Sequence, residues 1–143
     1  MNNPFVLLVD DEVAFVDTIK KRLVKRDLNV ISAHSGADAL ESIKQNRNLD
    51  VVILDVKMPG MDGIDTLKEI KKDYPLVEVI MLTAHATVET AIEGMKRGAF
   101  DYLMKPCEID QLVFKVSEAT AKKRSHEEKI REARIKELAS RHG

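Results

Sequence analysis

The sequence of 143 residues predicts an α/β fold with a doubly wound sheet of five parallel strands. Five apolar runs of strand length recur along the chain, and a segment with helical spacing follows each of them. Three of the runs are continuously apolar and β-branched, which is typical of parallel strands that helices cover on both faces. Strand and helix alternate, so we expect right-handed crossovers between neighbouring parallel strands.

The five predicted strands are short and evenly spaced. They are FVLLV at 5–9, NVISA at 29–33, VVILD at 51–55, VEVIML at 77–82 and FDYLM at 100–104. The first, third and fourth are the most continuously apolar, and we expect them at the centre of the sheet.

The helices are predicted from apolar residues that recur three or four positions apart. In chain order, these residues are Phe15, Ile19 and Leu23; Ala39, Leu40 and Ile43; Ile64, Leu67 and Ile70; Val88, Ile92 and Met95; and Ile109, Leu112, Val113 and Val116. Ser35, Asp62 and Thr87 are suitable N-caps for the second, third and fourth helices, and Gly98 is a suitable terminator for the fourth.

Charge divides the chain into two parts. The chain as a whole has 23 Lys and Arg against 24 Asp and Glu, a formal net charge of −1. Residues 122–143, however, hold eight Lys or Arg and four Glu, so their net charge is +4. We expect one domain over residues 1–121 and a basic helical extension over residues 122–143. Acidic residues precede basic ones by four positions at Glu127–Arg131, Glu132–Lys136 and Glu137–Arg141, which supports a helix. Its few apolar residues favour a solvated continuation of the fifth helix over a coiled coil.

Composition excludes several classes of protein. Cys107 is the single cysteine, so intramolecular disulfides are excluded and a reducing compartment is expected. The apolar run before Asp10 is too short for a signal peptide or a membrane span, which predicts a cytoplasmic protein without membrane contact. The near-zero net charge makes nucleic acid an unexpected partner for this chain alone.

Reactive side chains stand at four of the five strand ends. Asp10 and Asp11 follow the first strand, Asp55 ends the third, Thr83 follows the fourth and Lys105 follows the fifth. Ligands of an open α/β sheet bind beyond the carboxyl ends of its strands, so these side chains should meet in one site. Three neighbouring carboxylates repel one another unless a cation lies between them, and Mg²⁺ favours oxygen ligands. A lysine and a hydroxyl beside such an ion suit phosphoryl transfer.

Asp55 is the predicted nucleophile of this site. No strand end carries a Ser, Cys or His with an activating base. The segment VKMPGMDG after Asp55 predicts a turn that leaves the carboxylate accessible. The expected product is an acyl phosphate.

The segments LLVDDE, LDVKMPGMDG and MLTAHATVETAIEGMKRGAFDYLMKP resemble the receiver domain of bacterial two-component response regulators over about residues 4–121. The last segment is most similar to receivers of ATPase-containing transcription activators. The resemblance implies a flavodoxin-like strand order of 2-1-3-4-5. It also implies phosphorylation of Asp55 by a sensor histidine kinase or phosphotransfer protein. Mg²⁺ would be bound by Asp10, Asp55 and the Lys57 carbonyl, with Asp11 a direct or water-mediated ligand.

The resemblance assigns roles to further residues. Thr83 and Lys105 would contact the phosphoryl group, and Tyr102 would be the aromatic switch that turns inward when Thr83 is drawn to the phosphate. The Lys105–Pro106 bond is expected to be cis. The surface of the fourth helix, fifth strand and fifth helix would then signal to a protein target or support a homodimer.

Lys57 and His85 stand two positions after Asp55 and Thr83, beside the route by which water would reach the phosphate. The resemblance implies that such positions tune the dephosphorylation rate, without giving the direction of the effect; the alternative is that both are ordinary surface residues.

Other functions fit the sequence less well. A flavodoxin requires a phosphate-cradling loop where this chain has DDEV, and a haloacid-dehalogenase-like phosphatase requires Asp-x-Asp there. A phosphorylation-independent adaptor and a phosphorelay intermediate remain alternatives. The sequence contains neither a P-loop nor a helix-turn-helix, so it represents either a stand-alone receiver or a fragment of a longer regulator.

Overall fold

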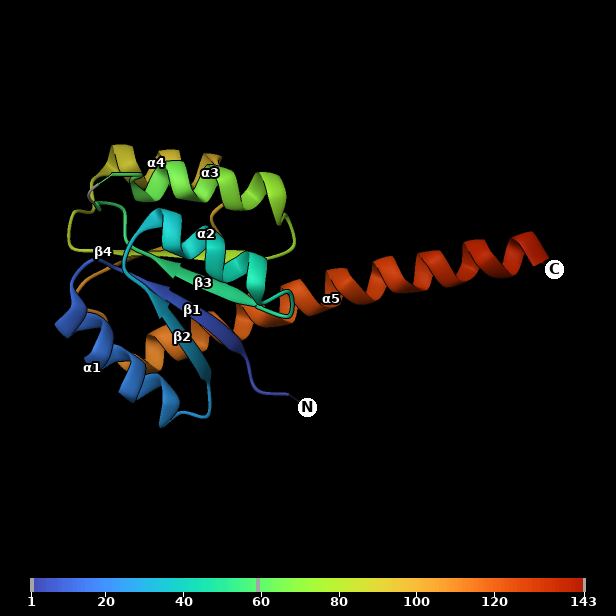
Figure 1. The fold of residues 1–143 in the computed structure, drawn as a ribbon, viewed down its shortest axis with the longest axis horizontal. Helices are drawn as coiled ribbons and strands as arrows, with labels where there is room; N and C mark the ends of the chain where they lie inside the picture. The colour runs from blue at the N-terminus through green and yellow to red at the C-terminus, as the bar shows by residue number, and fades with distance from the viewer. Residues whose placement is uncertain (1, 59, 143) are drawn as a thin grey trace.

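The computed structural model describes residues 2–58 and 60–142, and five strands alternate with five helices along them (Figure 1). Pro59, in the predicted turn after Asp55, lies outside the described residues. The strands are β1 Phe5–Val9, β2 Asn29–Ala33, β3 Val51–Leu54, β4 Glu78–Thr83 and β5 Asp101–Met104. The helices are α1 Val13–Val24, α2 Gly36–Gln45, α3 Gly63–Asp73, α4 Val88–Lys96 and α5 Ile109–His142.

The strands form one parallel sheet in the order β2-β1-β3-β4-β5, which confirms the predicted fold. The chain winds outward from β1 to β2 and then returns to the other side of β1 to form β3. The carboxyl ends of β1 and β3 therefore lie next to each other where the direction of winding reverses.

Helices cover both faces of the sheet (Figure 1). Alternate residues of the central strands belong to two separate cores, with Leu7 on one face and Leu8 on the other. The first core is closed by α2 and α3, and the second by α1 and α5. Burial on both faces explains the continuously apolar strand sequences.

The predicted helix caps are confirmed. The Ser35 side chain accepts a hydrogen bond from the Asp38 N–H, and the Asp62 side chain accepts one from the Asp65 N–H. Thr87 caps α4. Gly98 follows α4 with a φ of +97°, a left-handed conformation that glycine adopts without strain.

The apolar residues whose spacing predicts α4 face solvent. Val88, Ile92 and Met95 are 76%, 50% and 48% exposed. The buried residue of α4 is Gly94, on the opposite side of the helix. A Cβ at Gly94 would lie 3.6 Å from the Tyr102 ring, so the Gly94 side of α4 faces β5.

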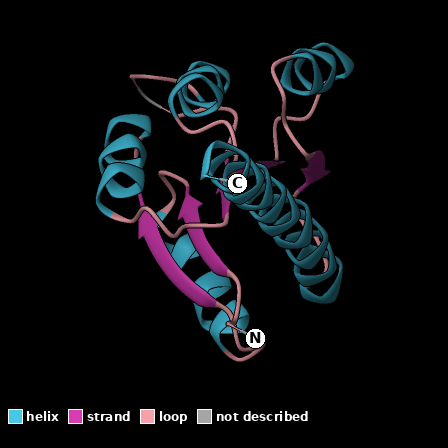
Figure 2. Ribbon diagram, turned by 90° about the vertical axis from the view of Figure 1, so that its right-hand side faces the viewer, coloured by secondary structure: helices cyan, strands magenta, loops and turns pink. Residues whose placement is uncertain are grey.

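Helix α5 is continuous from Ile109 to His142. Its first part packs on the sheet, and the rest projects from the domain (Figure 1); Figure 2 shows it close to end-on. The predicted ion pair Glu137–Arg141 forms, with 2.6 Å between the Arg141 Nη2 and the Glu137 Oε1. Arg131, which was expected to pair with Glu127, pairs with Glu128. Among the helices of residues 2–58 and 60–142, none has the length and apolar composition of a membrane span.

Candidate functional site

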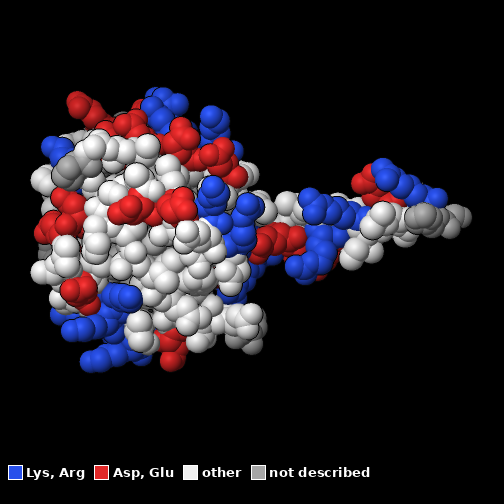
Figure 3. Space-filling model, in the orientation of Figure 1, with Lys and Arg blue, Asp and Glu red and all other residues white. Residues whose placement is uncertain are grey.

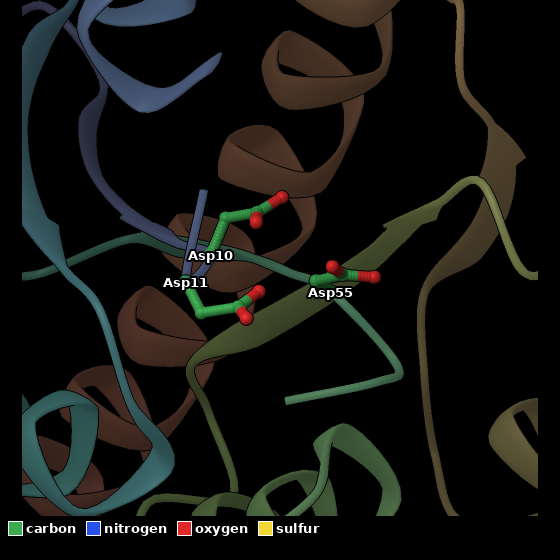
Figure 4. A group of neighbouring side chains, drawn as sticks. All are labelled: Asp10, Asp11 and Asp55. Carbon is green, nitrogen blue, oxygen red and sulfur yellow. The ribbon is translucent and has the colours of Figure 1, made fainter. Parts of the chain in front are cut away.

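Three carboxylates meet at the switch point of the sheet, as the sequence predicts (Figure 4). Asp10 and Asp11 directly follow β1, and Asp55 directly follows β3. One oxygen of each carboxylate lies within 4.8 Å of the others. Asp10 and Asp55 are buried and Asp11 is exposed, so the cluster opens to solvent on the Asp11 side.

The backbone fixes the two buried carboxylates. The Asp10 N–H donates to the Ala33 carbonyl at 3.1 Å, which continues the β1–β2 pairing. The Asp55 N–H donates to the Val9 carbonyl at 3.1 Å. The Asp10 carboxylate also accepts a hydrogen bond from the Glu12 N–H at 2.9 Å. Both side chains are therefore held by sheet geometry.

Asp55 has an unused oxygen. Its Oδ1 is buried and has no hydrogen-bond partner among the described residues, while Oδ2 lies 3.7 Å from the Lys105 Nζ. Buried carboxylate oxygens without a partner are rare because desolvation leaves them uncompensated. A free Asp55 oxygen beside two further carboxylates fits a hard cation such as Mg²⁺.

Lys105 brings positive charge to the cluster. Its Nζ donates to Asp10 Oδ2 at 2.5 Å and lies 3.5 Å from Glu12 Oε1. The ammonium also lies 4.0 Å from the centre of the Phe15 ring. The Lys105–Pro106 bond is cis, as expected.

Burial and charge shift two pKa values in this site. Burial raises the pKa of Asp10, and the Asp55 charge adds to this, although the hydrogen bond from Lys105 acts in the opposite direction. Burial alone would lower the pKa of Lys105, but the hydrogen bond and charge of Asp10, with the charges of Asp55 and Glu12, raise it above its ordinary value. Lys105 is therefore a cation at every physiological pH.

The remaining predicted residues lie on β4 and β5 and in the loops that follow β3 and β4. Thr83 is buried as the last residue of β4, its hydroxyl accepts a hydrogen bond from the His85 N–H at 3.0 Å, and its carbonyl accepts one from the Lys105 N–H at 2.9 Å. The side chains of His85 and Lys57 are exposed. Tyr102 lies on β5, and its hydroxyl contacts Thr90 on α4.

Two residues at the site were not predicted from the sequence. Glu12 and Phe15 both contact the Lys105 ammonium from the start of α1. Their positions offered a signal, because α1 begins directly after Asp10 and Asp11 and its first turn must lie beside the strand end. In the sequence, Phe15 indicates only the presence of the helix.

Comparisons with known proteins agree with this geometry. The model of the response regulator receiver domain family matches residues 6–117. The chain is 39% identical over 127 residues to the transcriptional regulatory protein ZraR of Klebsiella oxytoca, which covers 89% of this chain and 28% of that protein. It is 37% identical over 119 residues to the DNA-binding transcriptional regulator NtrC of Escherichia coli, covering 83% of this chain and 25% of the regulator. The chain thus spans about a quarter of the length of these curated relatives.

Solved structures show the same fold. A response regulator receiver domain protein from Clostridium thermocellum matches with a TM-score of 0.81 and 39% identity, covering 85% of this chain and 97% of that one. The receiver domain of NtrX from Brucella abortus matches with a TM-score of 0.76 and 33% identity, covering 81% and 98%. This chain belongs to the response regulator receiver domain family.

Proposed function

We propose that the chain accepts a phosphoryl group on Asp55 from a sensor histidine kinase or phosphotransfer protein, in a Mg²⁺-dependent reaction. The observation that carries this proposal is the buried, unpartnered Asp55 Oδ1 beside Asp10, Asp11 and the Lys105 ammonium. A carboxylate oxygen without a partner, next to an ammonium that compensates its charge, is suited to act as a nucleophile.

The transfer forms one bond and breaks another. An Asp55 oxygen attacks the phosphorus of a phosphohistidine, the phosphorus–nitrogen bond breaks, and the imidazole leaves with the bonding electron pair. Asp10, Asp11, Asp55 and the Lys57 carbonyl would hold the metal ion. When bound, Mg²⁺ supplies positive charge to the transferring phosphoryl oxygens.

Lys105 and Thr83 act on the phosphoryl oxygens from the protein side. The ammonium already lies 3.7 Å from Asp55, so it can move to a phosphoryl oxygen without leaving the site. Among the described residues, the Thr83 hydroxyl accepts one hydrogen bond, from the His85 N–H, and its own proton is available to a new anion. We expect its movement to allow Tyr102 to turn inward. Lys57 and His85, whose side chains are exposed beside the acceptor, would tune the rate of phosphate loss.

The signalling surface is proposed on α4, β5 and α5. Large apolar side chains are exposed there, among them Val88, Ile92, Met104 and Phe114. Such side chains support a protein partner or a homodimer that forms on phosphorylation. We place the receiver within residues 1–121 and the basic extension at 122–143. The curated relatives are longer transcriptional regulators, so a nucleic-acid partner is proposed only for a longer protein.

Intact-mass spectrometry tests the acceptor directly. The chain is incubated with acetyl phosphate and Mg²⁺, and Asp55→Asn is compared with the exposed control Asp65→Asn. We expect one phosphoryl group on the wild type and on Asp65→Asn, and none on Asp55→Asn or with EDTA. Absence of the modification from the folded wild type, both with acetyl phosphate and with a phosphorylated histidine donor, would refute the proposal.

A further inference from the structure

Tyr102 is held by Thr90, a residue that has no role in the proposed phosphoryl transfer. The Tyr102 hydroxyl and the Thr90 Oγ1 are 2.7 Å apart. Thr90 lies in the first turn of α4, one helical turn before Gly94, against which the Tyr102 ring packs. Ring and hydroxyl are thus fixed on the same side of the same helix. Tyr102 is only half-buried, so this contact, rather than enclosure, determines where its hydroxyl lies.

Thr90 is also part of the cap of α4. The Thr90 N–H donates to the Thr87 Oγ1 at 3.1 Å, and the Thr87 N–H donates to the Thr90 Oγ1 at 3.1 Å. The Thr90 hydroxyl lies 3.1 Å from the Thr87 carbonyl as well. A threonine hydroxyl has one proton and two acceptor positions. The Thr87 Oγ1 is a further neighbour, at 2.9 Å. If the Thr90 proton goes to the Thr87 carbonyl, the Thr87 N–H and the Tyr102 O–H fill both acceptor positions of Thr90, and the Thr87 hydroxyl directs its own proton away from Thr90.

This network connects the acceptor site with Tyr102. Thr83 ends β4, and only residues 84–86 separate it from the Thr87 cap. When the Thr83 hydroxyl moves toward a phosphoryl group, the short connection pulls on the cap, and the cap holds Tyr102 through Thr90. Tyr102 cannot turn inward while its hydroxyl remains bound to Thr90.

We infer that the Thr90 hydroxyl is a latch that holds Tyr102 and the start of α4 in the resting arrangement and opens when Asp55 is phosphorylated. With the latch, the resting state is more stable than it would be if Thr83 and Tyr102 alone formed the switch. This inference rests on the proposed phosphorylation of Asp55. Thr90 is a positioning residue, because it touches neither the phosphoryl group nor the metal site.

The test uses beryllofluoride with Mg²⁺ as the phosphoryl mimic and follows amide NMR signals around Asp55. Thr90→Val keeps the shape of threonine and removes the hydroxyl, while Tyr102→Phe removes the other half of the contact and leaves the α4 cap intact. We expect each variant to lower the half-saturating beryllofluoride concentration about two- to tenfold, the range for one hydrogen bond. Because both variants break the same contact, the double variant should gain no more than either single one. Thr90→Ser keeps the hydroxyl and should behave as the wild type.

A role in helix capping alone gives a different result. In that case Thr90→Val would act but Tyr102→Phe would not, and Thr87→Ala, which breaks the cap from its other end, would reproduce the Thr90→Val effect. That pattern would overturn the latch. So would a double variant in which the effects of Thr90→Val and Tyr102→Phe add, or a half-saturating beryllofluoride concentration that is higher in Thr90→Val than in the wild type.

The resting chain supplies a readout that is independent of phosphorylation. The sequence has two tyrosines, so fluorotyrosine labelling gives one ¹⁹F signal for Tyr102 and one for Tyr74 as an internal reference. Thr90→Val should move the Tyr102 signal and leave the Tyr74 signal in place. If the wild type does not respond to beryllofluoride and gains no phosphoryl group, the proposed function fails. The ¹⁹F measurement still tests the Thr90–Tyr102 contact in that case, because it uses the resting chain. An unmoved Tyr102 signal overturns the latch.

Discussion

At the scale of single residues, the site combines groups whose charges depend on one another. Burial raises the pKa of Asp10, so a proton competes with a cation for this carboxylate at a higher pH than for an ordinary aspartate. Acidification from neutral pH to about pH 5 should therefore weaken Mg²⁺ binding. Isothermal titration calorimetry at several pH values measures this. Asp10→Asn should bind weakly with a flatter pH dependence, and a wild-type affinity that stays constant over this range contradicts the expectation.

Phe15 is expected to position the Lys105 ammonium. The centre of the Phe15 ring lies 4.0 Å from Nζ, so the ammonium is attracted to the π face of the ring. Phe15→Leu keeps an apolar cover but removes the π face, and we expect phosphorylation by acetyl phosphate to slow about two- to tenfold. Phe100→Leu is the matched control, since the Phe100 ring lies under Lys122, at 5.6 Å and away from the acceptor. Equal rates in the two variants would show that the Phe15 ring has no such role.

At the scale of elements, the start of α3 depends on the absence of a side chain. A Cβ at Gly63 would lie 2.0 Å from the Asp55 carbonyl oxygen and 2.6 Å from the Val56 Cα. The neighbours are backbone atoms of the acceptor turn, so they cannot yield without moving Asp55. Gly63→Ala should lower the free energy of unfolding by about 2–4 kcal/mol, in the range of severe steric substitutions, and should slow phosphorylation.

Gly94→Ala provides the control for stability. A Cβ at Gly94 would meet side-chain atoms no closer than 3.6 Å, an ordinary contact distance. The higher helix propensity of alanine should leave the variant at least as stable as the wild type. Urea unfolding compares the two variants. If the free energy of unfolding falls by similar amounts in Gly63→Ala and Gly94→Ala, the packing around Gly63 relaxes more easily than the structure indicates.

The elements that the sequence predicted best are those defined by local chemistry. Ser35, Asp62 and Thr87 cap their helices through side-chain bonds that span only three residues. The orientation of α4 does not follow from its apolar residues: Val88, Ile92 and Met95 face solvent, and the buried residue of the helix is Gly94. Helical spacing indicates that a helix has two sides, but not which side a neighbouring strand will cover.

At the scale of the whole molecule, the candidate site was predictable because topology alone places strand ends together. Asp10 and Asp55 meet once the strands are ordered with β1 beside β3. The attachment of the C-terminal extension was not predictable in this way. The sequence places Lys123 and Arg124 in a basic segment that is predicted to be solvated. In the structure both contact Asp50, more than 70 positions earlier in the chain.

Asp50 joins the sheet to the projecting helix. It is buried just before β3 and accepts hydrogen bonds from the Phe5 N–H at 2.9 Å, from Lys123 at 3.2 Å and from Arg124 at 2.9 Å. Arg124 also donates to the Asn2 carbonyl at 2.7 Å. Beyond this point the charges of α5 alternate along an exposed surface (Figure 3). The Asp50 contacts therefore tie this part of α5 to the sheet and to the start of the chain.

Removing Asp50 tests this attachment. The side chains of Asp50 and Lys123 are only 3% and 5% exposed, so Asp50→Ala removes the buried partner of the Lys123 ammonium and leaves it with the more exposed Glu127 carboxylate, at 3.1 Å. We expect the free energy of unfolding to fall by about 3–5 kcal/mol, and the amides of α5 near Lys123 to exchange faster with deuterium. The control is Glu128→Ala, which breaks the exposed pair with Arg131 and should cost less than about 1 kcal/mol. If the free energy of unfolding falls by similar amounts in the two variants, the buried Asp50 carboxylate does not anchor α5. The apolar contacts of the first half of α5 would then hold the helix to the domain.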